Sequence, residues 1–310
     1  MRRFGFLLVP GFSMLSLAAT VEPLRMANAQ SKQDLYAWDF LSWSGREVTA
    51  SNNMFTAPTL ALTQVKELDV LVVVAGVDVV TYGDDNFFVW LRNACRQVSI
   101  FGATSTGSLL LAKARLLRGR TCTIHWEYVD GFRERFVDVN MSGELYEFDG
   151  NLMTCSGGSA GMDMMLQRIS SEHGHELAML VAEQYMHPAI RPAHDDARMR
   201  LQSRLNINNS RLIKAVEVMQ GQLEQPLTCV QVAAMSNISE RQMERLFKQY
   251  LQQTPSQYYM YLRLQKAQHL LHQSSFSITQ IAQACGFNSV SYFARCYRQQ
   301  YDCVPSAARK

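Results

Sequence analysis

A serine and a histidine stand twenty residues apart in a pattern that could support nucleophilic chemistry. Ser105 lies in the small-residue run Gly102–Gly107, between a predicted strand and a predicted helix. A serine at such a turn, beside the N–H groups of a helix start, has the layout of a nucleophile elbow. His125 follows the next predicted strand and could act as the base, which would allow acyl transfer or hydrolysis.

Two stripes of side chains near the C-terminus have the spacing i, i+4, i+7 of one helix face. They lie 50 residues apart and consist of Arg241, Arg245 and Lys248 in the first stripe and Ser291, Arg295 and Arg298 in the second. An arginine on such a face can donate two hydrogen bonds to guanine O6 and N7, or it can hold a phosphate. Arginine and lysine can also simply make a helix face soluble, but the recurrence of the stripe in two copies favours DNA binding.

Each stripe is preceded by the same local pattern of a short helix and a tight turn. The stretch Val232–Ser239 recurs 49 residues later. Asn237 and Gly286 occupy the turn, where a positive φ is needed, and both residue types tolerate it. We therefore predict two helix-turn-helix units, at about residues 228–250 and 277–301.

A long helix is predicted between the two units, over residues 256–272. Its apolar side chains can pack on both units: Tyr258, Leu262, Ala267, Leu270 and Leu271. A stiff spacer of this kind would fix the separation of the two second helices. Helix-turn-helix units reach successive major grooves when they lie roughly 34 Å apart, so one chain would cover two turns of DNA.

Composition and charge divide the chain into two parts. With 310 residues, 47% of them hydrophobic and 18% charged, the chain can bury two cores. Residues 201–310 carry 12 Lys and Arg against 5 Asp and Glu, whereas residues 1–200 carry 18 against 22. The C-terminal third is therefore the part suited to binding a polyanion.

The N-terminal part alternates short apolar runs with helical stretches, as in a doubly wound α/β domain. Residues 4–9 and 70–74 are uninterrupted apolar runs, typical of strands buried on both faces of a parallel sheet. Further strands are predicted at residues 99–101, 121–124, 145–148 and 152–154, and helices at residues 14–29, 85–97, 107–114 and 159–173. The hairpin that turns at Asp149-Gly150 indicates an antiparallel edge.

These patterns predict a flavodoxin-like α/β domain over residues 1–187 and an all-α domain over residues 209–310. Between them, residues 188–208 are polar, begin with Pro188 and lack an apolar stripe, which is typical of a linker.

Several functional classes are disfavoured by the sequence. Seven cysteines without a CxxC pair indicate neither a disulfide framework nor a zinc site, and His173-Gly174-His175 lacks a third ligand at metal spacing. No metal or cofactor is therefore expected. Pro10-Gly11 interrupts the apolar run at the N-terminus, and no run approaches the roughly 18 residues that would span a bilayer. We expect a cytoplasmic protein without a membrane partner.

Residues 209–309 resemble the DNA-binding domain of the AraC/XylS family of bacterial transcription regulators. The motifs that carry this resemblance are Pro226-Leu227-Thr228, Ser239-x-Arg241-Gln242-x-x-Arg245-Leu246-Phe247-Lys248, Thr254-Pro255, Arg263-Leu264-x-x-Ala267, Ile281-Ala282-x-x-Cys285-Gly286-Phe287-x-Ser289-x-Ser291-Tyr292-Phe293-x-Arg295-x-Tyr297-Arg298 and Pro305-Ser306. In that family the second helix of each unit contacts bases. The resemblance assigns this role to Glu240, Arg241, Glu244, Arg245, Val290, Ser291, Tyr292 and Arg295, to which we add Lys248, Ser289 and Arg298 as candidate DNA contacts.

The N-terminal part resembles the PfpI-like branch of the class I glutamine-amidotransferase fold. The run from Ala112 to Trp126 is similar to the sensor domain of the GlxA subgroup of AraC regulators. Enzymes of this fold use a cysteine at the elbow and an acidic residue on the first helix, whereas this chain has Ser105 and Ser16 there. Because a hydroxyl is far less ionised than a thiol near neutral pH, we expect a degenerate elbow and no catalysis.

What remains at the elbow is a predicted ligand site at the carboxyl edge of a parallel sheet. Its candidate residues are Phe12, Ser16, Glu22, Gly76, Ser105, Thr106, His125 and Trp126. An aromatic ring there could face a cationic amine. Each polar or aromatic candidate also has a structural alternative: Trp126 as a core aromatic, His125 as a satisfied buried imidazole, and Glu22 as the partner of Arg25.

The resemblance implies a ligand-responsive activator of transcription. Regulators of the GlxA type respond to small amines, amino acids or quaternary ammonium compounds, and they activate the corresponding catabolic operons. The expected partners are double-stranded DNA, a small-molecule effector, RNA polymerase and a second copy of the chain. One alternative is a Ser105/His125 amidase or hydrolase with an accessory DNA-binding module. Another is a constitutive repressor with an inert N-terminal dimerisation domain.

Overall fold

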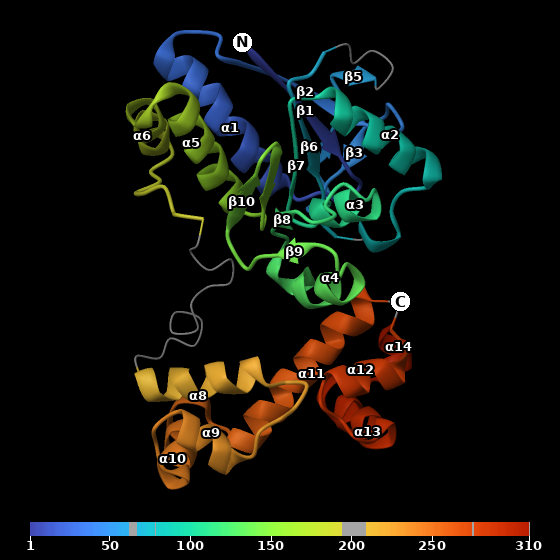
Figure 1. Cartoon of the computed structure of the whole chain (residues 1–310), viewed down its shortest axis with the longest axis vertical. Helices are drawn as coiled ribbons and strands as arrows, with labels where there is room; N and C mark the ends of the chain where they lie inside the picture. The colour runs from blue at the N-terminus through green and yellow to red at the C-terminus, as the bar shows by residue number, and fades with distance from the viewer. Residues whose placement is uncertain (62–66, 78, 194–208, 275, 310) are drawn as a thin grey trace. The chain divides into compact units, whose positions relative to one another are not determined.

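The chain forms two compact units, Met1–Ala197 and Arg198–Lys310, in a computed structural model that describes residues 1–61, 67–77, 79–193, 209–274 and 276–309 (Figure 1). Most of the predicted linker, from residue 194 to residue 208, lies outside the described residues. None of the helices in the described ranges combines the length and the hydrophobicity that a bilayer crossing requires.

A seven-stranded sheet forms the centre of the first unit. In spatial order its strands are β10 (Tyr146–Asp149), β11 (Leu152–Cys155), β7 (Ile100–Thr104), β6 (Val70–Val74), β1 (Arg2–Leu8), β2 (Tyr36–Ser42) and β5 (Leu60–Ala61). All neighbours are parallel except β10, which runs antiparallel to β11 through a turn at Gly150 with φ +60°. Both the doubly wound α/β class and the antiparallel edge are therefore confirmed.

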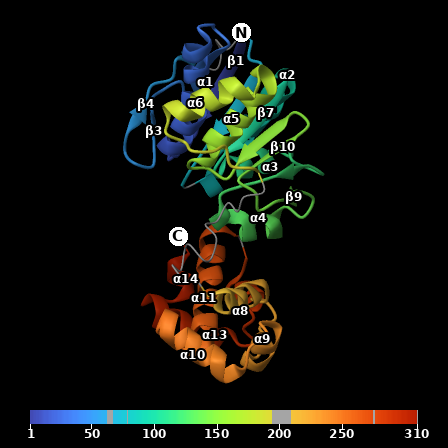
Figure 2. The same ribbon diagram turned by 90° about the vertical axis from the view of Figure 1, so that its left-hand side faces the viewer.

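Helices cover both faces of this sheet, because the central strands are apolar on both sides. Helices α1 (Met14–Ser31), α5 (Ala160–His173) and α6 (His175–Gln184) pack on one face, and α2 (Asp85–Gln97), α3 (Gly107–Lys113) and α4 (Val129–Arg135) pack with the other (Figures 1 and 2). Along β1 the side chains alternate: Phe4 and Phe6 enter the first core, and Leu7 enters the second.

The structure corrects one predicted strand. Only Thr121–Cys122 (β8) is a strand, and it pairs with Asn140–Met141 (β9) in a separate two-stranded sheet. The prediction that residues 123 and 124 extend this strand was wrong. The N–H of Thr123 donates to the side-chain oxygen of Thr154, and the Thr123 carbonyl accepts from Ser108, so both groups bind side chains instead of a neighbouring strand. A further short pair joins β3 (Val48–Thr49) to β4 (Phe55–Thr56).

The second unit is helical throughout its named elements. These are α8 (Ser210–Gly221), α9 (Cys229–Met235), α10 (Glu240–Leu251), α11 (Pro255–Gln273), α12 (Ile278–Ala284), α13 (Val290–Tyr301) and α14 (Pro305–Ala308). Thr228, Ser239, Thr254 and Ser277 each cap a helix together with a glutamine three residues later. Local hydrogen bonding alone therefore fixes where four of these helices begin.

Helix α11 joins two hydrophobic cores. Tyr258 and Leu262 are buried in the core formed by α8, α9 and α10, whereas Ala267 and Leu270 are buried in the core formed by α12 and α13. In Figure 1 this helix lies between the two helix-turn-helix units. The predicted spacer helix that packs on both units is therefore confirmed.

Candidate nucleic-acid interface and effector pocket

Helix α10 separates an apolar face from a charged one. Met243, Leu246 and Phe247 are buried in the core, so the residues between them point outward. All five candidate DNA contacts of this helix are exposed: Glu240, Arg241, Glu244, Arg245 and Lys248. These side chains therefore project into solvent from a helix whose position is fixed by its buried face and its N-terminal cap.

Helix α13 repeats this arrangement without acidic residues. Phe293 and Tyr297 are buried beneath it, and its six candidate contacts are exposed: Ser289, Val290, Ser291, Tyr292, Arg295 and Arg298. The Arg295 guanidinium lies 5.2 Å from the centre of the Tyr292 ring, which orients the charge along the helix surface. The two helices therefore present different chemistry, since α10 alone carries carboxylates.

The turn of each helix-turn-helix has the predicted residue with a left-handed backbone. Asn237 has φ +54° and Gly286 has φ +75°. At Gly286 a side chain is also excluded by space, because a Cβ there would lie 2.5 Å from a Pro226 ring carbon and 2.7 Å from the Leu223 carbonyl oxygen. The turn of the second helix-turn-helix thus packs directly against the loop that leads into the first helix-turn-helix, and this contact holds the two motifs together.

Arg263 is a structural residue of this domain. Its guanidinium donates to the carbonyl oxygens of Cys285 and Gly286 at 2.8 and 2.7 Å, and it stacks 4.1 Å from the centre of the Phe287 ring. Burial lowers the pKa of Arg263. It caps the end of α12 and therefore takes no part in the exposed stripes.

The predicted elbow in the first unit is present. Ser105 has φ +56° and is 5% exposed at the carboxyl end of β7. Its N–H donates to the Cys155 carbonyl at 2.9 Å, and its own carbonyl accepts from the His125 N–H at 3.2 Å. Three segments that are distant in sequence therefore meet at this turn.

Further candidates surround the elbow. The Thr106 hydroxyl donates to the Gly76 carbonyl at 2.6 Å, and Phe12 forms an isolated bridge with Gly76. Ser16 lies on α1, and its hydroxyl accepts from the Gly158 N–H at 2.8 Å. Phe12 and Ser16 are fully buried, so they form the floor of this region and present no surface to solvent.

His125 and Trp126 form the accessible side of the same region. Their ring centres lie 5.6 Å apart, both residues are half-buried, and the His125 Nδ1 atom lies 3.9 Å from a Glu127 carboxylate oxygen. Burial lowers the pKa of His125, and the nearby Glu127 only partly opposes that effect. The imidazole is therefore held towards its neutral form.

Acidification is expected to destabilise the first unit through His125. Its folded pKa lies below the ordinary value of 6.5, so the unfolded chain binds this proton more readily. The stability that it contributes is complete above pH 6.5 and is lost progressively as the pH falls from there to the lowered folded pKa. Unfolding followed by tryptophan fluorescence should show a shallower acid dependence for His125→Gln than for the unchanged protein. An identical acid dependence would contradict this assignment.

The contacts of Glu22 are with Arg25 and Tyr185 and not with the other candidate residues of the elbow. Its carboxylate pairs with Arg25 at 2.7 Å and accepts from the Tyr185 hydroxyl at 2.9 Å. These donors, Arg25 first, lower the pKa of Glu22. The pairing with Arg25 that was named as the structural alternative is present within α1. The hydrogen bond from Tyr185 joins α1 to the end of α6.

The Gly157-Gly158 pair is the part of the site that sequence analysis missed. It follows β11, and both residues have positive φ. A Cβ on Gly157 would lie 2.9 Å from the Ser105 hydroxyl oxygen, so the glycine backbone packs against the elbow side chain. The available signal was the double glycine one residue after a short strand.

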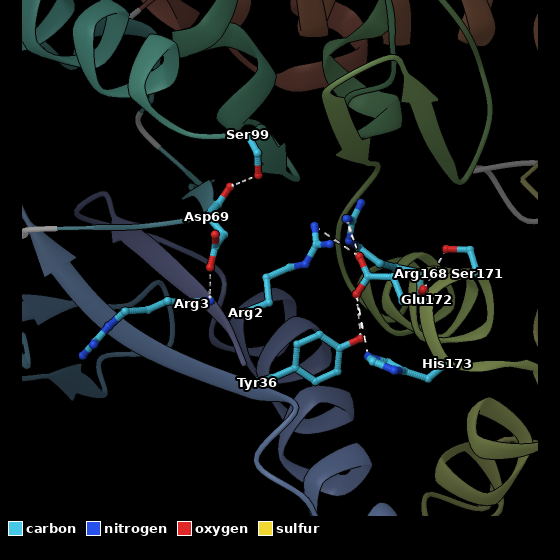
Figure 3. Close-up of polar contacts among 9 residues, drawn as sticks. All are labelled: Arg2, Arg3, Tyr36, Asp69, Ser99, Arg168, Ser171, Glu172 and His173. Atoms are coloured by element: carbon cyan, nitrogen blue, oxygen red, sulfur yellow. Dashed lines mark hydrogen bonds and ion pairs between the residues drawn. The ribbon is translucent and has the colours of Figure 1, made fainter.

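A second polar cluster lies at the amino edge of the same sheet (Figure 3). Glu172 accepts from the Tyr36 hydroxyl at 2.9 Å and pairs with Arg2 at 3.3 Å, and Arg168 also binds it. The hollow beside these residues measures about 810 Å³. Because Glu172 on α5 contacts Arg2 on β1 and Tyr36 on β2, we interpret the cluster as a structural link between this helix and the two strands.

All seven cysteines are free thiols. Over the described ranges, no three of the histidine, cysteine, aspartate and glutamate side chains come together as metal ligands would.

Comparison with known proteins places this geometry in a family. The family model "Helix-turn-helix domain" matches residues 232–310, and the DJ-1/PfpI family model matches residues 3–171. The chain is 42% identical over 306 residues to the HTH-type transcriptional regulator CdhR of Pseudomonas aeruginosa, covering 99% of this chain and 91% of that protein. It is 31% identical over 310 residues to the HTH-type transcriptional regulator GlxA of Rhizobium meliloti, covering 100% and 96%.

A solved structure supports the fold of the first unit. The crystal structure of an AraC family transcriptional regulator from Pseudomonas putida matches 60% of this chain and 100% of that chain, with a TM-score of 0.54 and 26% identity. Fold and exposed helices together define a DNA-binding transcription regulator whose tandem helix-turn-helix domain follows a DJ-1/PfpI domain. The chain belongs to the GlxA subgroup of the AraC family, and it is a regulator and not an enzyme.

Proposed function

We propose that this regulator responds to a small amine, an amino acid or a quaternary ammonium compound, and that it activates genes for the breakdown of that compound. The observation that carries this proposal is the elbow. The chain keeps the positive-φ turn at Ser105 and the packing of Gly157 around it, yet it has no thiol at the elbow and no acid at Ser16. A strained turn kept without its nucleophile is consistent with a site retained for binding.

The ligand would enter beside His125 and Trp126, the half-buried members of the site. An indole face attracts a cationic amine, and the Glu127 carboxylate nearby adds charge of the opposite sign. A neutral imidazole at His125 adds no repulsion. This chemistry favours a cation over an anion at the elbow.

The alternative of a Ser105/His125 hydrolase requires a hydrogen bond between the histidine ring and the serine hydroxyl. Within the described residues no hydrogen bond joins the His125 ring to the Ser105 hydroxyl, and the contact between the two residues is made through the backbone. A hydroxyl without an oriented base is a weak nucleophile. The elbow therefore supports binding better than acyl transfer.

At the DNA end, we propose that the exposed faces of α10 and α13 contact successive major grooves of one duplex. Residues 1–187 would sense the effector, residues 188–208 would connect the domains, and residues 209–310 would bind the promoter. A second copy of the chain and RNA polymerase complete the assembly, in the cytoplasm where the DNA lies. The effector would act by binding the DNA-competent state more tightly than the other.

The effector half of this proposal can be tested by a ligand screen. All four tryptophans lie between residues 38 and 126, so tryptophan fluorescence follows the first unit alone. A compound from a panel of amines, amino acids and quaternary ammonium compounds should stabilise that unit, by about 2.7 kcal/mol at a hundred times its Kd. The stabilisation should disappear in Trp126→Ala. It should persist in Trp90→Phe, because the Trp90 ring lies beside Trp43, with 6.0 Å between the ring centres. No stabilisation by any compound, or equal binding by Trp126→Ala, would contradict the proposal.

A further inference from the structure

A second hollow in the first unit is lined by basic residues. It measures about 650 Å³, and it lies between the C-terminal ends of α3 and α4. Its charged lining consists of Lys113, Arg115, Arg118, Arg135 and a single carboxylate, Asp138. This concentration of cations is unusual for its surroundings, because residues 1–200 as a whole carry more acidic than basic side chains.

Most of this positive charge is not neutralised by the protein. Arg118 pairs with Asp138 at 3.0 Å, but no ion pair involves the other three cations among the described residues. Lys113 donates to the carbonyl oxygens of Val80 and Tyr82, which leaves its charge without a carboxylate. The hollow therefore has a net positive charge and donors with spare capacity.

Helix termini explain only part of the cluster. Lys113 and Arg135 stand in the last turns of α3 and α4, where a cation interacts favourably with the helix dipole. Arg115 is the second residue after α3 and Arg118 lies further along the chain, so the dipole of α3 acts on them less strongly. Arg118 has a carboxylate partner, whereas Arg115 has none among the described residues.

The backbone at Arg115 determines how its side chain is presented to solvent. Arg115 has φ +60°, in the left-handed region where a glycine would be unstrained and a longer side chain is not. The chain nevertheless places an exposed guanidinium there. This conformation ends α3, since the Arg115 and Leu116 N–H groups donate to the Ala112 and Leu111 carbonyl oxygens. The guanidinium that it presents to solvent forms no ion pair among the described residues, so it is available to an anion from outside the protein.

We propose that this hollow binds a small multivalent oxyanion, either a phosphorylated compound or a polycarboxylate. The planar guanidinium groups of Arg115 and Arg135 suit phosphate and carboxylate oxygens, and Lys113 adds a point charge from the wall. Burial lowers the pKa of Lys113, and a bound anion would favour its charged form again. This hollow would bind an anion, whereas the elbow region, at the other end of α3, would bind a cation, so the two sites are distinct.

Calorimetric titration of the full chain with pyrophosphate and with citrate tests this site. We expect saturable binding that weakens with added salt, and about tenfold weaker binding for each guanidinium removed in Arg115→Gly and Arg135→Ala. Arg96→Ala is the matched control, since Arg96 is an exposed cation in the last turn of α2 and lies outside the hollow. Its affinity should equal that of the unchanged protein.

Arg115→Gly separates binding from folding. Because glycine relieves the positive φ, this variant should be at least as resistant to heat as the unchanged protein while its anion affinity falls. Preference for pyrophosphate would identify a phosphorylated ligand, and preference for citrate a polycarboxylate. The proposal is wrong if neither anion binds, if Arg115→Gly binds as tightly as Arg96→Ala, or if Arg115→Gly weakens binding of duplex DNA and leaves anion binding unchanged.

Discussion

Replacing both Arg245 and Arg295 by alanine is expected to weaken binding of the promoter DNA by about 2–6 kcal/mol. Each guanidinium is exposed on the outward face of its helix, and loss of one base-contacting arginine costs roughly 1–3 kcal/mol. The two residues lie on separate helices with separate cores, so their effects should add. Titration of a labelled promoter fragment at fixed salt concentration measures this loss.

Arg211→Ala is the matched control for that titration. Arg211 is exposed in the same domain but belongs to α8 and is therefore part of neither α10 nor α13. Its replacement should change affinity only slightly, through the general electrostatic attraction. If the double variant bound the promoter as tightly as Arg211→Ala, the proposed role of the two stripes would be wrong.

Replacing Asp163 by alanine is expected to destabilise the first unit by about 3–5 kcal/mol. Its fully buried carboxylate accepts from the Arg191 N–H at 2.8 Å and from the Arg191 guanidinium at 2.6 and 3.0 Å. It also contacts the His187 ring at 2.8 Å. These contacts fasten the segment that follows α6 onto α5, and the variant would leave several donors without an acceptor.

Denaturant unfolding followed by tryptophan fluorescence measures this loss in the full chain, since the tryptophans all lie in the first unit. Glu22→Gln serves as the control, because the Glu22–Arg25 pair is partly exposed and such pairs contribute about 0–1 kcal/mol. A similar midpoint for both variants would show that the buried carboxylate has no special role.

Sequence alone predicted the elements whose pattern is local. The strands β1 and β6 are continuous apolar runs, and the four capping boxes of the second unit mark its helices within a few residues. Strand β2 was missed because Asp39 interrupts its apolar pattern, and the reason for that carboxylate is its pairing with Arg3 on the neighbouring strand. Helix α6 was missed because only Gly174 separates it from α5.

The two candidate sites differed in how far sequence could describe them. The exposed stripes follow from spacing along single helices, so the sequence was sufficient to place them. The elbow region depends on contacts between distant segments, such as the hydrogen bond from Gly158 to Ser16 across 142 positions. No local pattern could show that the Ser16 hydroxyl accepts a hydrogen bond from the protein's own backbone, or that Phe12 is buried beneath the site.

Base-by-base substitution of the promoter, measured with each single arginine variant, tests the central claim most directly. We expect the unchanged protein to be sensitive to two blocks of bases about one helical turn apart on one face of the duplex. Arg245→Ala should lose sensitivity within one block only, and Arg295→Ala within the other only. A single sensitive block, or loss of the same block in both variants, would contradict the view that α10 and α13 contact successive grooves of one duplex.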